Sequence, residues 1–93
     1  NVRLSPAHRA AAPLIRRVLL EARAMAGTHS PAEIQRICLE KLHTDELRPE
    51  YLEIVDRLTL EPLDEQFDFV RSAVACTAVW AGDVRLIDNI ILF

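Results

Sequence analysis

The side chains in this chain that are best suited to metal binding or catalysis are three histidines and two cysteines. They are His8, His29, Cys38, His43 and Cys76. Zinc sites gather such side chains, and their ligands recur at short, characteristic intervals along a sequence. The intervals between the three histidines match none of these patterns, so the sequence predicts no metal site. Exposed or helix-capping positions are the better interpretation of the histidines.

Nucleotide binding and acid–base catalysis find equally little support. A phosphate-binding loop needs several glycines, whereas this chain has only Gly27 and Gly82. Acidic pairs occur at Asp64-Glu65 and at Asp45-Glu46, the latter preceded by Glu40. Charge in loops and at helix ends is ordinarily just solvated. The sequence therefore predicts no catalytic residue.

Three polar residues interrupt an apolar run near the end of the chain. Arg85, Asp88 and Asn89 lie among five aliphatic residues between positions 84 and 91. An ion pair with a neighbouring strand and an Asx-type turn would account for them, and contact with a ligand is the alternative. We interpret the three as a structural motif of a sheet.

The composition is that of one small globular domain. Of 93 residues, 51% are hydrophobic and 27% are charged, which suffices for a modest core. The formal net charge of −3 offers no attraction to nucleic acid. Apolar runs are well short of the roughly 20 residues of a membrane helix, so no membrane segment is predicted. Cys38 and Cys76 lie far apart in apolar stretches, which indicates buried free thiols in a reducing compartment.

Local signals predict a helical first half. Ser5 followed by Pro6 begins a helix, and Pro13 forces a kink or a fresh start. The main helix then covers about 13 to 26. A second helix begins with a capping box in the segment 30 to 33 and runs to about His43. Pro49 is expected to close the helical half.

A period of two predicts strands in the second half. One strand begins at Tyr51, a second covers 70 to 80 with small apolar residues on both faces, and a third covers 84 to 91. Gly82 supplies the turn of a hairpin between the last two. The predicted fold is α+β, a two-layer sandwich of two main helices packed on a small antiparallel sheet of about three strands.

Several stretches resemble the pantothenate synthetase family, also called pantoate–β-alanine ligases. The strongest is Ala-Val-Trp-Ala-Gly-Asp-Val-Arg-Leu-Ile-Asp-Asn-Ile at 78 to 90. The segments 1 to 6 and 9 to 13 resemble the stretch after the family's Ser-Ser-Arg phosphate-binding motif, and 51 to 56 with 59 to 63 resembles its middle strand and loop. Arg57 and Asp83-Val84 differ from the residues that are most common at these positions in the family, and neither position has an assigned catalytic role. The matches are in family order and cover the whole chain.

The resemblance implies that residues 1–93 are the C-terminal lid domain of a cytoplasmic, homodimeric ligase whose Rossmann-like N-terminal domain is absent. Such an enzyme uses ATP and Mg²⁺ to convert pantoate into pantoyl adenylate, which β-alanine then attacks. No catalytic or metal-binding residue carries over onto this segment, and alone it is expected to be inactive. Asn1, Val2 and Arg3 would form the hinge next to the ATP phosphate motif, from which Arg3 could swing toward the phosphates.

A protein-interaction module is the alternative function. One face of the second predicted strand carries Ala73, Ala75, Thr77 and Val79, which are small and mostly apolar. With no third layer expected in the chain, this face would be left uncovered for a protein partner.

Overall fold

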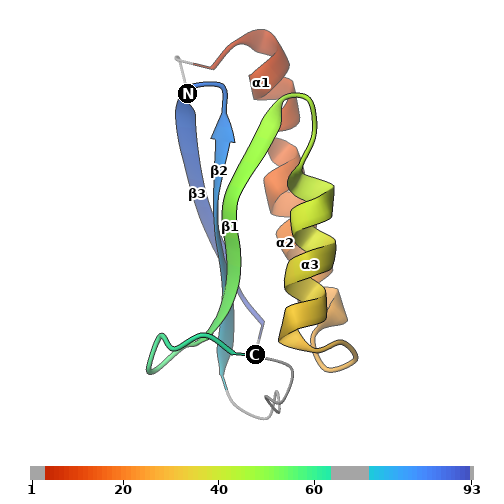
Figure 1. The fold of residues 1–93 in the computed structure, drawn as a ribbon, viewed down its shortest axis with the longest axis vertical. Helices are drawn as coiled ribbons and strands as arrows, with labels where there is room; N and C mark the ends of the chain where they lie inside the picture. Colours follow the sequence, from red (N-terminus) through yellow and green to blue (C-terminus); the bar gives the residue numbers. More distant parts are fainter. Residues whose placement is uncertain (1–3, 64–71, 93) are drawn as a thin grey trace.

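A computed structural model describes residues 4–63 and 72–92, and Figure 1 shows the arrangement of its layers. The elements in chain order are α1 (Pro6–Ala11), α2 (Pro13–Met25), α3 (Pro31–Leu42), β1 (Leu47–Asp56), β2 (Ala73–Ala81) and β3 (Val84–Ile91). The strands form one antiparallel sheet in the order β1-β2-β3. Helices α2 and α3 cover one side of it (Figure 1). The predicted two-layer α+β fold is confirmed.

Prolines and capping serines begin the helices where the sequence indicated. The Ser5 hydroxyl accepts a hydrogen bond from the backbone N–H of His8, and Pro6 opens α1. Pro13 begins α2 two residues after α1 ends, so the fresh start expected there is confirmed. The capping box of α3 is also formed, because Ser30 and Glu33 each accept a hydrogen bond from the other's backbone N–H.

The first strand is longer than predicted, and the role given to Pro49 was wrong. β1 begins at Leu47, so Pro49 lies inside a strand rather than at the end of the helical half. A proline is tolerated there because β1 is an edge strand, where one backbone N–H need not find a partner. The register with β2 shifts between Pro49 and Tyr51, which makes Glu50 the extra residue of a bulge.

The second and third strands form the predicted hairpin. Ala81 pairs with Val84 across a two-residue turn in which Gly82 has a φ of +64°. β2 begins at Ala73, and of the stretch 70 to 80 assigned to it, residues 70 and 71 lie outside the described residues. The Asx-type turn expected at Asp88 and Asn89 is not formed. Both residues belong to β3, which runs unbroken to Ile91 because it pairs with β2 along its whole length.

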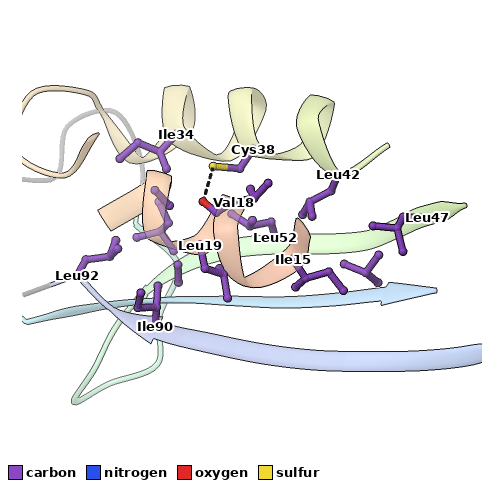
Figure 2. Close-up of a cluster of buried hydrophobic side chains, with 14 of the residues drawn as sticks. Ile15, Val18, Leu19, Ile34, Cys38, Leu42, Leu47, Leu52, Ile90 and Leu92 are labelled. Carbon is purple, nitrogen blue, oxygen red and sulfur yellow. Dashed lines mark hydrogen bonds between the residues drawn. The ribbon is translucent and has the colours of Figure 1, made fainter. Parts of the chain in front are cut away.

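The core lies between the helices and the sheet. Figure 2 shows aliphatic side chains of α2, α3 and the strands meeting there, with the Cys38 thiol 4.0 Å from the backbone oxygen of Val18. Fully buried members include Val18, Leu19, Ile34, Leu42, Leu47, Leu52, Ile54 and Val79. This layer removes the helix-facing side of the central strand from contact with solvent.

The face proposed for a protein partner belongs to this core, so that prediction was wrong. Ala73, Ala75, Thr77 and Val79 are each 0% exposed. The Thr77 hydroxyl is satisfied internally, since it donates a hydrogen bond of 2.7 Å to the backbone oxygen of Tyr51. Strand alternation permits either face of β2 to be covered, and the helices pack on the one that the hypothesis had left open.

Candidate functional site

The side of the sheet away from the helices carries a mixture of aromatic, charged and aliphatic residues. We call this side the open face. The register aligns Tyr51, Ala78 and Ile87 across its middle, and Arg48, Trp80 and Arg85 toward the hairpin turn. Toward the other end, the aligned residues are Glu53, Cys76 and Asn89, followed by Val55, Val74 and Ile91. All three strands contribute, so the sheet holds these side chains at fixed spacings.

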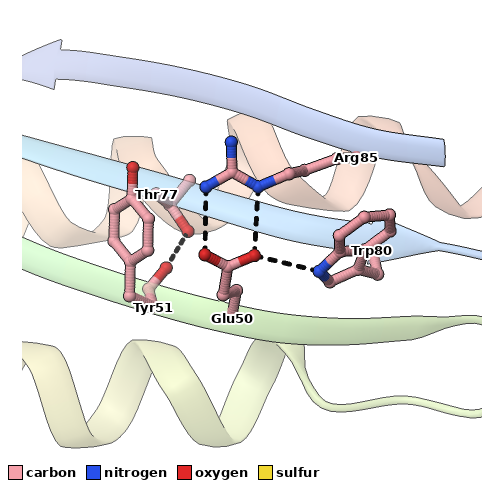
Figure 3. A network of polar contacts seen from close by, with 5 residues as sticks. All are labelled: Glu50, Tyr51, Thr77, Trp80 and Arg85. Carbon is pink, nitrogen blue, oxygen red and sulfur yellow. Dashed lines mark hydrogen bonds and ion pairs between the residues drawn. The ribbon is translucent and has the colours of Figure 1, made fainter.

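A polar network joins the three strands on the open face (Figure 3). Arg85 on β3 donates two hydrogen bonds of 3.0 Å, from Nε and from one terminal nitrogen, to the two carboxylate oxygens of Glu50 on β1. The indole Nε1 of Trp80 on β2 donates a third, also 3.0 Å, to Glu50. The forked contact is the favoured geometry of a guanidinium with a carboxylate. It lowers the pKa of Glu50, chiefly through the bonds from Arg85 and then that from Trp80, and it raises the pKa of Arg85.

The partner of Arg85 is a residue that the sequence interpretation missed. The predicted strand began at Tyr51, which left Glu50 outside the sheet. The bulge after Pro49 turns the Glu50 side chain onto the open face, where it spans β2 to reach β3. The expected ion pair of Arg85 therefore exists, but with the strand beyond its neighbour. The sequence does show opposite charges on the two segments that flank the apolar central strand. That pattern alone does not identify Glu50 as the partner of Arg85.

The other two residues of the predicted motif contact helix α2 instead of Glu50. Asp88 lies opposite Thr77 and so belongs to the helix side of the sheet, away from Arg85. Its carboxylate is 3.7 Å from Arg16 of α2, which also donates a 3.0 Å hydrogen bond to the backbone oxygen of Asn89. These contacts tie α2 to the edge strand. The proposed hinge, residues 1 to 3, lies outside the described residues.

A cavity of about 300 Å³ lies beside the network, at the hairpin end of the sheet. It is lined by His8, His43, Thr44, Asp45, Glu46, Leu47, Arg48, Trp80 and Gly82. Trp80 thus borders both the cavity and the network. The His8 ring lies so close to the turn that a Cβ on Gly82 would be 3.0 Å from its Cε1 atom. Two histidines 35 positions apart in sequence line the same cavity, which their spacing did not predict.

A hydrogen bond already engages one of the two histidines that line the cavity. His8 is already held by the capping residue, with Nδ1 2.6 Å from the Ser5 hydroxyl, as expected of a cap histidine. Within residues 4–63 and 72–92, no three His, Cys, Asp or Glu side chains are grouped so as to hold a metal ion. In the same residues, no helix has the length and apolar character to cross a membrane.

The two thiols are poor nucleophiles. Burial raises the pKa of Cys38 to about 11 and also raises that of Cys76, with the Glu53 charge as a second cause for Cys76. At neutral pH both are therefore protonated, and a thiol rather than a thiolate reacts slowly. Both are free cysteines, and Cys38 is buried as predicted, whereas Cys76 is only half-buried.

The family of the chain follows from comparison with known proteins. The model of the family described as pantoate-beta-alanine ligase matches residues 1–91. This chain belongs to the pantoate–β-alanine ligase family. The predicted family resemblance is confirmed over nearly the whole chain.

Relatives of the ligase family resemble the chain in sequence and in fold. A pantothenate synthetase of Porphyromonas gingivalis is 43% identical over 97% of this chain, and the pantoate–beta-alanine ligase of Arabidopsis thaliana is 41% identical over the same share. The crystal structure of the Thermus thermophilus pantothenate synthetase superposes on all of the chain with a TM-score of 0.82 and 39% identity. The chain spans about a third of these relatives, covering 32%, 29% and 33% of their lengths.

Proposed function

We propose that residues 1–93 form the C-terminal domain of a pantoate–β-alanine ligase and act as a hinged lid over an active site in the rest of that enzyme. The observation that carries this proposal is the match to ligases along the chain, which spans only about a third of their length. The position at the C-terminus rests on the family resemblance of the segment 1 to 6 to the stretch after the Ser-Ser-Arg motif.

The reaction proposed for the full ligase forms an amide bond in two steps. ATP converts the pantoate carboxylate, a poor electrophile, into pantoyl adenylate with release of pyrophosphate. The β-alanine amine then attacks the acyl carbon and AMP leaves. The family resemblance puts the nucleotide and Mg²⁺ contacts in the N-terminal domain, so we assign ATP and Mg²⁺ to the part of the ligase outside this segment.

The contribution proposed for this domain is the exclusion of water. An acyl adenylate hydrolyses if water reaches it, and a domain that closes over the site prevents this loss. A lid has to move as one body. The continuous core between two helices and three strands supports such rigidity. We assign the hinge to Asn1, Val2 and Arg3, and the dimer contact to the remaining part of the enzyme. The two free thiols fit a reducing compartment such as the cytoplasm.

The test compares the full ligase with residues 1–93 alone. Each is supplied with pantoate, β-alanine, ATP and Mg²⁺, and pantothenate is measured by mass spectrometry. We expect product from the full ligase and none from the segment. Turnover by the isolated segment would show that the domain assignment is wrong. An inactive full-length enzyme would contradict the proposed reaction.

A matched pair of variants tests the hinge. In the full ligase, Arg3→Ala is expected to raise the KM for ATP, because a cation near the phosphates is lost. Arg17→Ala removes an exposed cation from α2 and is expected to leave that KM unchanged. Equal KM values in the two variants would contradict the role of Arg3.

A further inference from the structure

The cavity at the hairpin end of the sheet is formed by segments that are far apart in the sequence. Its walls come from α1, from the loop between α3 and β1, from the first residues of β1 and from the hairpin of β2 and β3. The volume of about 300 Å³ lies at the lower end of the range found for small-molecule sites. A ligand that fits it is therefore small.

The loop between α3 and β1, residues 43 to 46, brings two carboxylates to the cavity on a fixed turn. The Thr44 hydroxyl accepts hydrogen bonds from the backbone N–H groups of Glu46 at 3.3 Å and of Leu47 at 3.1 Å. The backbone N–H of Thr44 donates to the backbone oxygen of Leu47, whose side chain is buried in the core. Asp45 and Glu46, which both line the cavity, are thus carried by an ordered turn.

The opposite charge in the cavity wall belongs to Arg48. The register pairs Arg48 with Trp80, which also lines the cavity. The nearby carboxylate of Glu50 is already engaged, because it accepts hydrogen bonds from Trp80 and from Arg85. Within residues 4–63 and 72–92, neither the Arg48 guanidinium nor either carboxylate of the loop has an ion-pair or hydrogen-bond partner.

Charges of both signs that line one cavity without contacting each other favour a ligand that carries both. A simple anion would be repelled by the two carboxylates, and a simple cation would be repelled by the guanidinium. We propose that the cavity binds a small zwitterion of the amino-acid type. Its carboxylate contacts Arg48, and its ammonium group contacts Asp45 and Glu46. The indole of Trp80 supplies apolar surface for the methylene groups between the two charges.

The walls of this site are held in place before a ligand arrives. The Trp80 indole is fixed by its 3.0 Å hydrogen bond to Glu50, and the His8 ring lies against the turn at Gly82 with its Nδ1 held by Ser5. Binding therefore orders few side chains, which lowers its entropic cost. The proposed site does not depend on the movement of a lid.

The experiment follows the indole N–H signal of Trp80 by NMR in the full ligase labelled with ¹⁵N-tryptophan. Trp80→Phe identifies the signal by its loss. The probes are glycine and γ-aminobutyrate, which differ in the spacing of their charges, with butyrate and butylamine as analogues that carry one charge each. We expect γ-aminobutyrate to shift the signal saturably, with a Kd at least about tenfold lower than that of either analogue, because each analogue leaves charged groups of the site without a partner.

Variants that remove one charge at a time separate the two halves of the site. Arg48→Gln should raise the Kd for γ-aminobutyrate by about tenfold and leave that for butylamine unchanged or lower, because only the contact with the carboxylate is lost. The double variant Asp45→Asn, Glu46→Gln should weaken butylamine and γ-aminobutyrate but not butyrate. Arg17→Gln, which removes an exposed cation from α2, serves as the control and should change none of these Kd values.

Each result decides the proposal. The absence of a saturable shift with both glycine and γ-aminobutyrate would overturn it. A Kd for one of the single-charge analogues equal to that for γ-aminobutyrate would show a plain cation or anion site and would overturn it as well. A shift that survives both Arg48→Gln and the double variant would place the ligand elsewhere. Pantothenate formation is no part of this readout, so a failure of the proposed function would not alter the result.

Discussion

The side chains on the two faces of the sheet interact mainly through different forces. On the helix side, every described residue of β2 is fully or almost fully buried, and the one buried hydroxyl among them, that of Thr77, has an internal acceptor. On the open face, apart from Val55 and Ala78, the side chains are half-buried or exposed, and one carboxylate is shared between a guanidinium and an indole. The helix side depends on removal of apolar surface from water, whereas the open face depends on oriented hydrogen bonds.

The difference separates residues that maintain the fold from residues that are free to serve another molecule. A side chain such as Leu19 is fully enclosed by its own domain. Ile87 is 65% exposed and does little for the domain that carries it. Substitutions on the two faces should therefore differ in size and in the context where they matter.

The largest effect is expected in the core. Leu19→Ala should lower the free energy of unfolding by about 2 to 5 kcal/mol, because it removes buried methyl groups and leaves a cavity. Ile87→Ala in residues 1–93 should change it by less than about 0.5 kcal/mol, as exposed positions usually do. Urea unfolding followed by circular dichroism measures both. Similar losses of unfolding free energy in the two variants would show that the two faces contribute equally to stability.

An intermediate effect is expected at the hairpin turn, where the His8 ring of α1 meets the end of the sheet. Gly82→Ala places a Cβ on a residue with a φ of +64° and 3.0 Å from that ring. The left-handed conformation alone should lower the free energy of unfolding by about 1 to 2 kcal/mol. Adding His8→Ala relieves the contact but not the backbone strain, so the double variant should recover only part of the loss. Thermal unfolding compares them, and an unchanged midpoint for Gly82→Ala would contradict the argument.

The smallest effect is expected in the network, and it depends on pH. The hydrogen bonds from Arg85 and Trp80 hold the pKa of Glu50 below its ordinary value of 4.5, so the folded state binds fewer protons at this group than the unfolded state. The stabilisation is therefore fully present above pH 4.5 and is lost as pH falls through the lowered pKa. Glu50→Gln should destabilise the domain slightly at neutral pH and less in acid.

The control for this prediction is Glu53→Gln, on the same strand and face but outside the network. Urea midpoints measured at about pH 7 and about pH 3 give the acid sensitivity of each variant. A gap between parent and Glu50→Gln that stays constant, or widens in acid, would show that the network is not formed in solution.

Local chemistry accounts for the elements that the sequence predicted well. The break at Pro13, the capping box between Ser30 and Glu33, and the turn at Gly82 each depend on residues within about one helical turn or hairpin of one another. Such signals depend on neighbouring residues alone, so they can be recognised without knowing which distant segments come together. The fold class followed from placing these elements in order.

What the sequence did not predict depends on contacts between distant segments. Glu50 and Arg85 are 35 positions apart, and the bulge that aligns them exists only once β1 and β2 are paired. The choice of the covered face was wrong for the same reason, since both faces of β2 are apolar and only the packing of α2 and α3 distinguishes them. The cavity that joins His8 and His43 is likewise a product of tertiary structure.

Pro49 also bears on how the protein behaves at high concentration. On the outer edge of β1, Ile54 and Asp56 already bond to Gln35 and to the loop after the strand. The backbone nearer Pro49 could take up a strand from another molecule and begin aggregation. A proline has no N–H to offer, and the bulge beside it bends the strand away from the flat shape that such growth requires. Pro49, which made the beginning of β1 hard to predict from the sequence, thus disfavours strand pairing between molecules.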